Sequence, residues 1–143
     1  MRQPYVFGID GGGTRSRLAV CDAAGNVVHS AEGGSTNIYS AAPEAVRNNL
    51  RELLEPLSRF GNPVAGMIAA GCIGSAGLAR EAERELIGSF VREVLPDTPL
   101  HLCSDGEILL CGGLHSLEGY ALISGTGSLA LSRRSDGSIR RSG

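Results

Sequence analysis

Short apolar runs separated by glycine turns dominate the start of the chain, and longer stretches with helical spacing follow them. Runs at residues 5–9, 18–21 and 27–29 predict three strands that form an antiparallel meander. In residues 43–57 and 82–94 the apolar side chains recur at helical spacing, which predicts two amphipathic helices. The opening of the chain therefore combines a small sheet with helices that can cover it.

Further strands alternate with these helices. Residues 64–73 and 99–103 are short apolar runs flanked by loops, and residues 108–114 predict a short third helix. The expected order is three strands, helix, strand, helix, strand, helix. Strands that alternate with helices after a meander imply a mixed sheet. The expected fold class is therefore α/β, with a mixed five-stranded sheet and helices on both of its faces.

The end of the chain repeats the pattern of its beginning. A strand at 120–123, a glycine turn at 124–128 and a strand at 129–132 follow the same order as the opening meander. We therefore expect a first domain at residues 1–118 and the first meander of a second, truncated domain of similar fold at 119–143. A native protein that continues further, or a deliberate fragment, would explain this division. Chance similarity between two hairpins is the alternative.

Composition narrows the classes of function. The chain has 143 residues, of which 42% are hydrophobic, so it can bury a core. Its net charge is −2, which argues against a nucleic-acid partner. All 13 basic residues are arginine, so a P-loop and a lysine Schiff base are excluded. The longest uncharged run, at 62–79, contains glycines and a proline, so we expect no membrane span and a cytoplasmic protein.

Cysteine usage agrees with a reducing compartment. No C-x-x-C pair occurs, and each cysteine lies in an apolar setting, which favours buried free thiols over a metal or cluster site. The four cysteines are Cys21, Cys72, Cys103 and Cys111.

Glycine is unusually frequent and concentrates in turns that could hold phosphate. The chain has 21 glycines, about twice the usual share of roughly 7%. In a glycine turn, positive φ and the missing Cβ let successive N–H groups converge on an anion. One such turn alone is more typical of a plain hairpin, but two in matching register could clamp a nucleoside triphosphate. The candidate phosphate-binding residues are Gly11, Gly12, Gly13, Thr14, Gly125, Thr126, Gly127 and Ser128.

Two aspartates stand at predicted strand ends. Asp10 directly precedes the first glycine turn, where it could hold Mg²⁺ against phosphates or simply accept backbone N–H groups of the turn. Asp105 follows the strand at 99–103, at the sheet edge where α/β proteins bind ligands. Asp105 could accept the proton of an attacking hydroxyl, or cap the following helix, and these two roles are compatible.

Polar and glycine residues in two loops could contact a sugar. Residues 35–37, Ser-Thr-Asn, carry donors and acceptors that suit sugar hydroxyls, although a simple Asx or Ser/Thr turn explains them equally well. Gly77 ends a short loop after the strand at 64–73, and it either lines the pocket or forms a tight connection.

The combination of these segments resembles a known family. GIDGGGT at 8–14 is similar to the first phosphate motif of the actin-like ATPase and sugar kinase superfamily. Together with residues 35–37, 104–106 and 123–128, it resembles the N-acetylglucosamine kinases of the BadF/BadG/BcrA/BcrD-type ATPases. The resemblance implies a ribonuclease H-like domain that uses ATP and Mg²⁺ to phosphorylate an amino sugar at its 6-hydroxyl.

The resemblance also implies a role for each motif. Asp105 would be the general base and Asp10 the carboxylate on the magnesium side. The glycine turns at 11–14 and 125–128 would hold phosphates, Asn37 would contact the sugar, and Thr126 would lie near it. From the residues and the resemblance together, the candidate substrate-binding residues are Ser35, Thr36, Asn37, Gly77, Asp105 and Thr126.

The resemblance leaves other functions open. Relatives continue with a G-W-G segment beyond the second meander, which this chain does not reach, so we expect the isolated chain to be inactive and to bind ATP weakly. An ATP-driven activator of an iron–sulfur dehydratase is an alternative, although the predicted cysteine positions disfavour it. A non-catalytic sugar- or nucleotide-sensing module is another. The choice of amino sugar stays open, as does the oligomeric state, a homodimer included.

Overall fold

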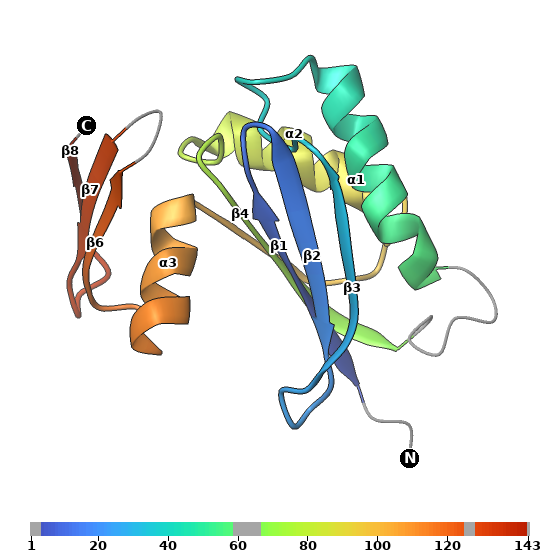
Figure 1. The fold of residues 1–143 in the computed structure, drawn as a ribbon, viewed down its shortest axis with the longest axis horizontal. Coiled ribbons are helices and arrows are strands. Elements are labelled where there is room, and N and C mark those ends of the chain that lie inside the picture. The colour runs from blue at the N-terminus through green and yellow to red at the C-terminus, as the bar shows by residue number, and fades with distance from the viewer. Residues whose placement is uncertain (1–3, 59–66, 125–127, 143) are drawn as a thin grey trace.

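A five-stranded mixed sheet forms the centre of the molecule (Figure 1). The computed structural model describes residues 4–58, 67–124 and 128–142. The sheet has the order β3-β2-β1-β4-β5, in which the first three strands are antiparallel and β4 and β5 run parallel to β1. Its strands are β1 (Tyr5–Gly11), β2 (Arg15–Cys21), β3 (Val27–Gly34), β4 (Ile68–Ser75) and β5 (Leu100–Cys103).

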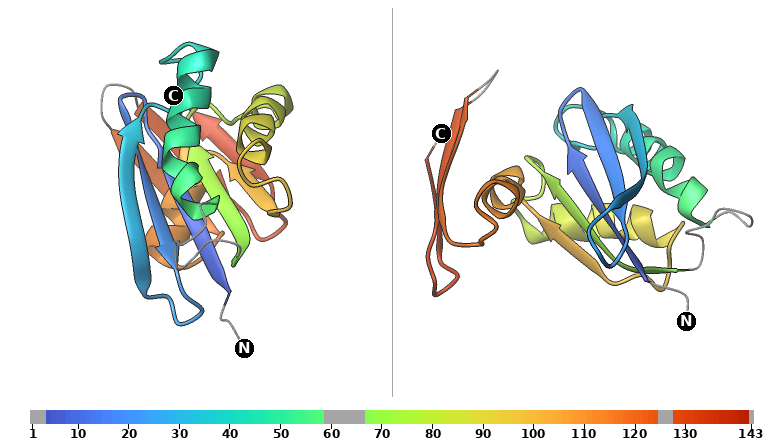
Figure 2. Two further views of the ribbon diagram at one scale, coloured as in Figure 1. Left: turned by 90° about the vertical axis from the view of Figure 1, so that its right-hand side faces the viewer. Right: turned by 60° about the horizontal axis from the view of Figure 1, so that its bottom comes forward.

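Two amphipathic helices cover one face of this sheet. They are α1 (Pro43–Ser58) and α2 (Glu81–Arg92), and Figure 2 shows both on the same side of the strands. The helical periodicity correctly predicts the buried side of α1, because its apolar side chains all join the main core. These buried residues are Val46, Leu50, Leu53, Leu54 and Leu57.

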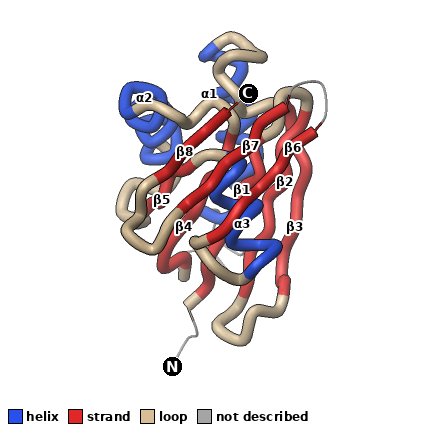
Figure 3. The backbone as a smooth tube through the Cα atoms, turned by 90° about the vertical axis from the view of Figure 1, so that its left-hand side faces the viewer, coloured by secondary structure: helices blue, strands red, loops and turns tan. Residues whose placement is uncertain are grey.

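A third helix and a second sheet lie on the other face. Helix α3 (Asp105–Leu114) is followed by an antiparallel sheet of β6 (Gly119–Ser124), β7 (Ser128–Arg133) and β8 (Ile139–Ser142). Figure 1 shows α3 between the two sheets, and Figure 3 shows the small sheet from its outer side. A separate cluster of Leu110, Ala121 and Leu131 joins α3 to the small sheet. The expected mixed sheet with helices on both faces is therefore confirmed.

Three sequence expectations about local structure were wrong. Strand β3 extends to Gly34, because its second half pairs with β2, and so the polar loop begins at Ser35. Helix α3 begins at Asp105 rather than at residue 108, because Ser104 caps it. The cysteines are not all buried, since Cys111 lies exposed on α3.

Candidate functional site

The carboxyl ends of the parallel strands lie at one edge of the five-stranded sheet. Asp10 on β1 is in register with Gly74 on β4, and Gly74 is in register with Cys103, the last residue of β5. Asp105 comes two residues after Cys103, as the first residue of α3. Because parallel strands end together, the chain brings two carboxylates that are far apart in sequence to the same edge.

Both aspartates open into one hollow. The hollow has a volume of about 720 Å³, and Asp10 and Asp105 are its charged lining residues. Helix α3 contributes Ile108, Leu109, Gly112 and Gly113, and β6 contributes Leu122 and Ile123. Two carboxylates in an otherwise apolar hollow at a sheet edge are typical of a ligand-binding site.

The helix cap is provided by Ser104 rather than by Asp105. The Ser104 hydroxyl accepts the N–H of Glu107 at 3.4 Å, and a carboxylate oxygen of Glu107 accepts the N–H of Ser104 at 3.0 Å. This reciprocal pair is a capping box. Asp105 accepts only the adjacent N–H of Gly106, at 2.9 Å, among the hydrogen bonds described for its side chain. The capping role considered for Asp105 is therefore wrong, and Asp105 is a lining residue of the hollow.

The first glycine turn does not use left-handed backbone. Within the described ranges the glycines with positive φ are Gly25, Gly119 and Gly137, so the expected positive φ at residues 11–13 is absent. Gly11 is required by close approach, because a Cβ there would lie 2.5 Å from the Thr36 hydroxyl oxygen.

Among the proposed phosphate donors of this turn, one N–H group is already hydrogen-bonded within the hairpin. The Gly12 N–H donates to the Arg15 carbonyl at 3.0 Å and closes the hairpin. Gly13 and Thr14 are exposed at its tip. An anion at this turn would therefore meet Gly13 and Thr14 before Gly12.

The polar loop that follows β3 packs directly on this turn. The Ser35 hydroxyl donates to the Gly12 carbonyl at 2.9 Å. The hydroxyls of Thr36 and Ser16 share a buried hydrogen bond of 2.8 Å, and the Thr36 N–H donates to the Ser16 hydroxyl at 3.1 Å. These contacts place residues 35–37 beside the start of the glycine turn.

Asn37 forms the local turn that the sequence left open as an alternative. Its side-chain oxygen accepts the N–H of Tyr39 at 2.9 Å, and its own N–H donates to the Ser35 hydroxyl at 3.2 Å. A Cβ at Gly77 would lie 2.8 Å from that same Asn37 oxygen. The loop after β4 therefore approaches Asn37 closely, which the structure permits because residue 77 is a glycine.

The second glycine turn falls largely outside the described residues. Gly125, Thr126 and Gly127 lie there, so their proposed roles stay predictions. Ser128 opens β7 and pairs with Ser124 across the turn. The strand that leads into this turn lines the same hollow as Asp10 and Asp105.

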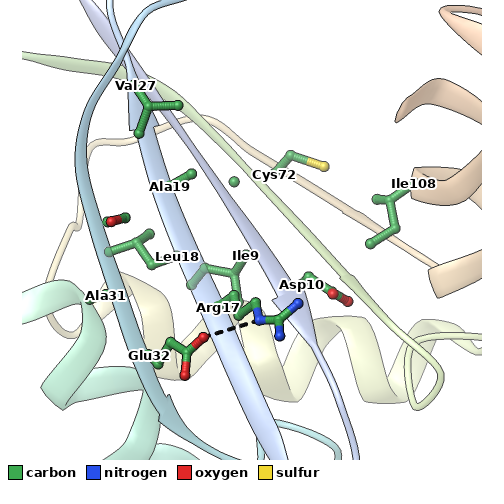
Figure 4. A pocket seen from close by; sticks show the side chains of 12 residues that line it. Ile9, Asp10, Arg17, Leu18, Ala19, Val27, Ala31, Glu32, Cys72 and Ile108 are labelled. Atoms are coloured by element: carbon green, nitrogen blue, oxygen red, sulfur yellow. Dashed lines mark hydrogen bonds and ion pairs between the residues drawn. The ribbon is translucent and has the colours of Figure 1, made fainter. Parts of the chain in front are cut away.

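A second hollow of about 700 Å³ adjoins the first on the α3 side of the sheet. Asp10 and Ile108 line both hollows. Figure 4 shows Arg17 directed to Glu32 at one side of this second hollow, where their side chains meet at 3.2 Å, with Ile108 at the other side. Arg17 is therefore paired with a carboxylate of its own sheet.

One polar contact of the site region was missed by the sequence analysis. Tyr39, two residues after Asn37, donates from its hydroxyl to the Glu83 carboxylate of α2. This hydrogen bond lowers the pKa of Glu83 and raises the pKa of Tyr39. The two residues are 44 positions apart, and no motif spacing connects them.

Clusters of metal ligands and membrane-spanning helices were also sought. In residues 4–58, 67–124 and 128–142, no three His, Cys, Asp or Glu side chains gather closely enough to bind a metal ion. No helix in those ranges is long and apolar enough to cross a membrane. A metal at the hollow would therefore need ligands in addition to the carboxylates of the described residues.

Comparison with known proteins supports a sugar kinase relationship. The chain is 35% identical over 140 residues to an N-acetylmuramic acid/N-acetylglucosamine kinase of Clostridium acetobutylicum. The aligned region covers 97% of this chain and 45% of that protein. It is 27% identical to an N-acetyl-D-glucosamine kinase of Dictyostelium discoideum, covering 100% of this chain and 48% of the relative. The chain thus spans about half the length of these curated relatives.

The fold is also found among solved structures. A ROK family glucokinase of Streptomyces griseus superposes with a TM-score of 0.65 at 18% identity, covering 95% of this chain and 46% of that one. This likeness confirms the expected actin-like ATPase fold. The model of the BadF/BadG/BcrA/BcrD ATPase family matches residues 7–143. The chain therefore belongs to the BadF/BadG/BcrA/BcrD ATPase family.

Proposed function

We propose that this protein is an ATP-dependent kinase that transfers the γ-phosphoryl group to the 6-hydroxyl of N-acetylglucosamine or a related amino sugar. The observation that carries the proposal is the single hollow onto which Asp10 and Asp105 both open. Its relatives of known class, two amino-sugar kinases, support the same reaction. In this proposal residues 1–143 supply the first domain and the start of a second.

Asp105 acts as the general base. It stands at the start of α3, at the sheet edge, and it lines the hollow. A carboxylate there accepts the proton of the sugar hydroxyl as the hydroxyl oxygen attacks phosphorus, which phosphoryl transfer requires. Helix α3 and strand β6 supply the apolar walls beside this carboxylate.

Asp10 fits the magnesium side of the same reaction. Mg²⁺ keeps several waters and is commonly bound through one or two carboxylates together with substrate phosphates. One exposed carboxylate beside a glycine turn satisfies that requirement, without the larger ligand cluster that the described residues lack. When bound, the ion neutralises charge on the phosphates. Asp10 would hold it, and the turns at 11–14 and 125–128 would hold the phosphates.

Sugar binding is assigned to the neighbouring polar loops. Ser35, Thr36 and Asn37 lie against the first glycine turn through the hydrogen bonds of Ser35 and Thr36. Gly77 contacts Asn37 from the loop after β4. These two loops and Asp105 would contact the sugar, with Thr126 approaching from the second glycine turn.

The iron–sulfur activator remains the second candidate, and a sensing module the third. An activator needs cysteine ligands at a dimer interface. Cys72 and Cys103 lie on neighbouring strands within the sheet, whereas only Cys111 is exposed among the four cysteines. The cysteine arrangement thus favours the kinase.

The test is Asp105→Asn in the protein expressed from its complete reading frame. Asparagine keeps the oxygen that accepts the Gly106 N–H, but it cannot accept a proton. We expect turnover with ATP and N-acetylglucosamine to fall about 10²- to 10⁴-fold, while calorimetry shows sugar binding within about twofold of the parent, a difference of roughly 0.4 kcal/mol.

The matched control is Asp97→Asn, an exposed aspartate outside the hollow, which should leave turnover unchanged. Full activity of the Asp105→Asn variant would contradict the general-base role. A parent protein that phosphorylates no amino sugar in a panel would contradict the kinase itself.

A further inference from the structure

A hydrogen bond ties the polar loop to α2. The Tyr39 hydroxyl donates to a carboxylate oxygen of Glu83. Tyr39 belongs to the loop that carries Ser35, Thr36 and Asn37, whereas Glu83 lies in the first turn of α2. The contact therefore joins a candidate sugar-binding loop to a helix that packs in the main core.

The carboxylate end of this contact is rigidly held. Glu83 is only 8% exposed, and its second oxygen accepts the N–H of Arg80 at 2.6 Å. This hydrogen bond satisfies the backbone N–H of the residue that precedes α2. A buried carboxylate whose second oxygen is bound to the backbone has little freedom to follow the loop. Glu83 is therefore the fixed partner, and Tyr39 the one that is held.

The tyrosine end is coupled directly to Asn37. The Tyr39 N–H donates to the Asn37 side-chain oxygen at 2.9 Å, and that oxygen also packs against Gly77. The Tyr39 ring itself is 66% exposed, so packing does little to restrain it. The hydroxyl bond to Glu83 is thus the main restraint on the Tyr39 side chain, and the backbone N–H of the same residue orients the Asn37 amide.

We propose that Tyr39 and Glu83 are positioning residues that hold the loop of Ser35, Thr36 and Asn37 in its sugar-binding conformation. This inference rests on the proposed function, because it takes residues 35–37 as sugar contacts. Without the bond the loop samples other conformations, and the apparent dissociation constant rises as the competent fraction falls. A competent fraction of about one tenth corresponds to a tenfold weaker affinity.

The first test is Tyr39→Phe in the complete protein, with N-acetylglucosamine as the probe. Phenylalanine keeps the ring and removes only the hydroxyl. We expect the dissociation constant for the sugar, and its KM, to rise about tenfold, while kcat stays within twofold because Asp105 is untouched. The matched control is Tyr120→Phe, an exposed tyrosine on β6, which should change neither constant.

A second variant separates positioning from stability. Tyr39→Phe leaves the buried Glu83 carboxylate without one donor, so it should also lower Tm. Glu83→Gln retains an oxygen that can accept the Arg80 N–H, and its amide can donate to the tyrosine oxygen. This single variant should therefore change sugar affinity by less than about threefold, roughly 0.7 kcal/mol. In the double variant the buried group that loses the tyrosine donor is a neutral amide, although the 4.0 Å ion pair between Glu83 and Arg80 is lost as well. Tm should therefore recover in part, while the affinity remains weak.

The outcomes distinguish the two proposals. Weak affinity combined with a partly recovered Tm in the double variant supports the positioning role. Affinity that returns together with Tm, or a Tyr39→Phe variant that binds the sugar as the parent does, overturns it and leaves the kinase proposal intact. A parent protein that binds no amino sugar overturns the proposed function and this inference with it.

Discussion

The sulfur atoms of Cys72 and Cys103 lie 4.0 Å apart on neighbouring parallel strands. The hydrogen bond between the two thiols lowers the pKa of Cys72 to about 7 and raises the pKa of Cys103. Cys72 also lines the second hollow. We therefore expect one thiol of the pair to ionise near neutral pH while its partner stays protonated.

Alkylation should show this difference. As pH rises through about 7, Cys72 loses its proton and its rate of reaction with iodoacetamide increases. As pH falls below 7, that rate should drop. Peptide mass spectrometry should place the half-maximal rate for Cys72 near pH 7. A rate for Cys72 that does not rise as pH passes through 7 would contradict the contact.

The positions of single residues could be predicted from the sequence where the cause is local, whereas their roles remain predictions. The sequence places Asp10 before a turn and Asp105 after a strand, and the structure brings both to one hollow. The sequence could not decide which residue caps α3, because Ser104 and Asp105 are both good capping residues. It gave no signal for Tyr39 and Glu83, since their contact depends on how α2 packs beside a loop.

At the scale of elements, α3 depends on its cap more than α1 and α2 do on theirs. It has only ten residues, and among its apolar side chains Leu110 is buried whereas Leu109 and Leu114 are exposed. Such a helix lacks the amphipathic pattern that identifies α1. Its start is therefore fixed by the capping box of Ser104 and Glu107, which also sets the position of Asp105.

Ser104→Ala should test this dependence. The substitution removes the hydroxyl that accepts the Glu107 N–H and that also donates to the Glu107 carboxylate at 3.0 Å. We expect the free energy of unfolding, measured by urea titration, to fall by about 1 kcal/mol. Turnover should fall as well, because Asp105 is the next residue.

The conservative change Ser104→Thr keeps the hydroxyl, so it should retain most of the free energy of unfolding and most of the turnover. If alanine and threonine behave alike, the cap does not position Asp105.

The boundaries of helices and strands could be predicted where they depend on local sequence, and not where they depend on contacts with distant segments. The apolar residues of α1 recur at helical spacing, so the sequence predicts its buried face well. The second half of β3 contains Ser30, Glu32, Gly33 and Gly34, which have weak strand propensity. It is extended because it pairs with β2 along its length, and this tertiary contact is invisible in a local pattern.

At the scale of the whole molecule, two sheets are built around separate apolar clusters. The main core lies between the five-stranded sheet and helices α1 and α2, and a small cluster joins α3 to the second sheet. The division into domains at 1–118 and 119–143 remains a prediction, as do the homodimer and the inactivity of the isolated chain. The small cluster alone connects residues 119–143 to the rest through buried apolar side chains in the described ranges.

This arrangement predicts that the two sheets can be destabilised separately. Leu131, which is 2% exposed, packs with Leu110 and Ala121. Replacing a buried leucine by alanine costs about 2–5 kcal/mol, and a cluster of three residues has few other contacts to compensate. In the 143-residue chain, Leu131→Ala should therefore speed amide hydrogen exchange in β6, β7 and β8 while leaving β1, β4 and β5 protected.

The matched control is Leu122→Ala, a leucine on β6 that is 73% exposed. The control loses little burial, so its exchange should match that of the parent in both sheets. If Leu131→Ala instead speeds exchange equally in both sheets, the chain unfolds as one cooperative unit. The small sheet would then be an integral part of the first domain, because its local opening would cost as much as global unfolding.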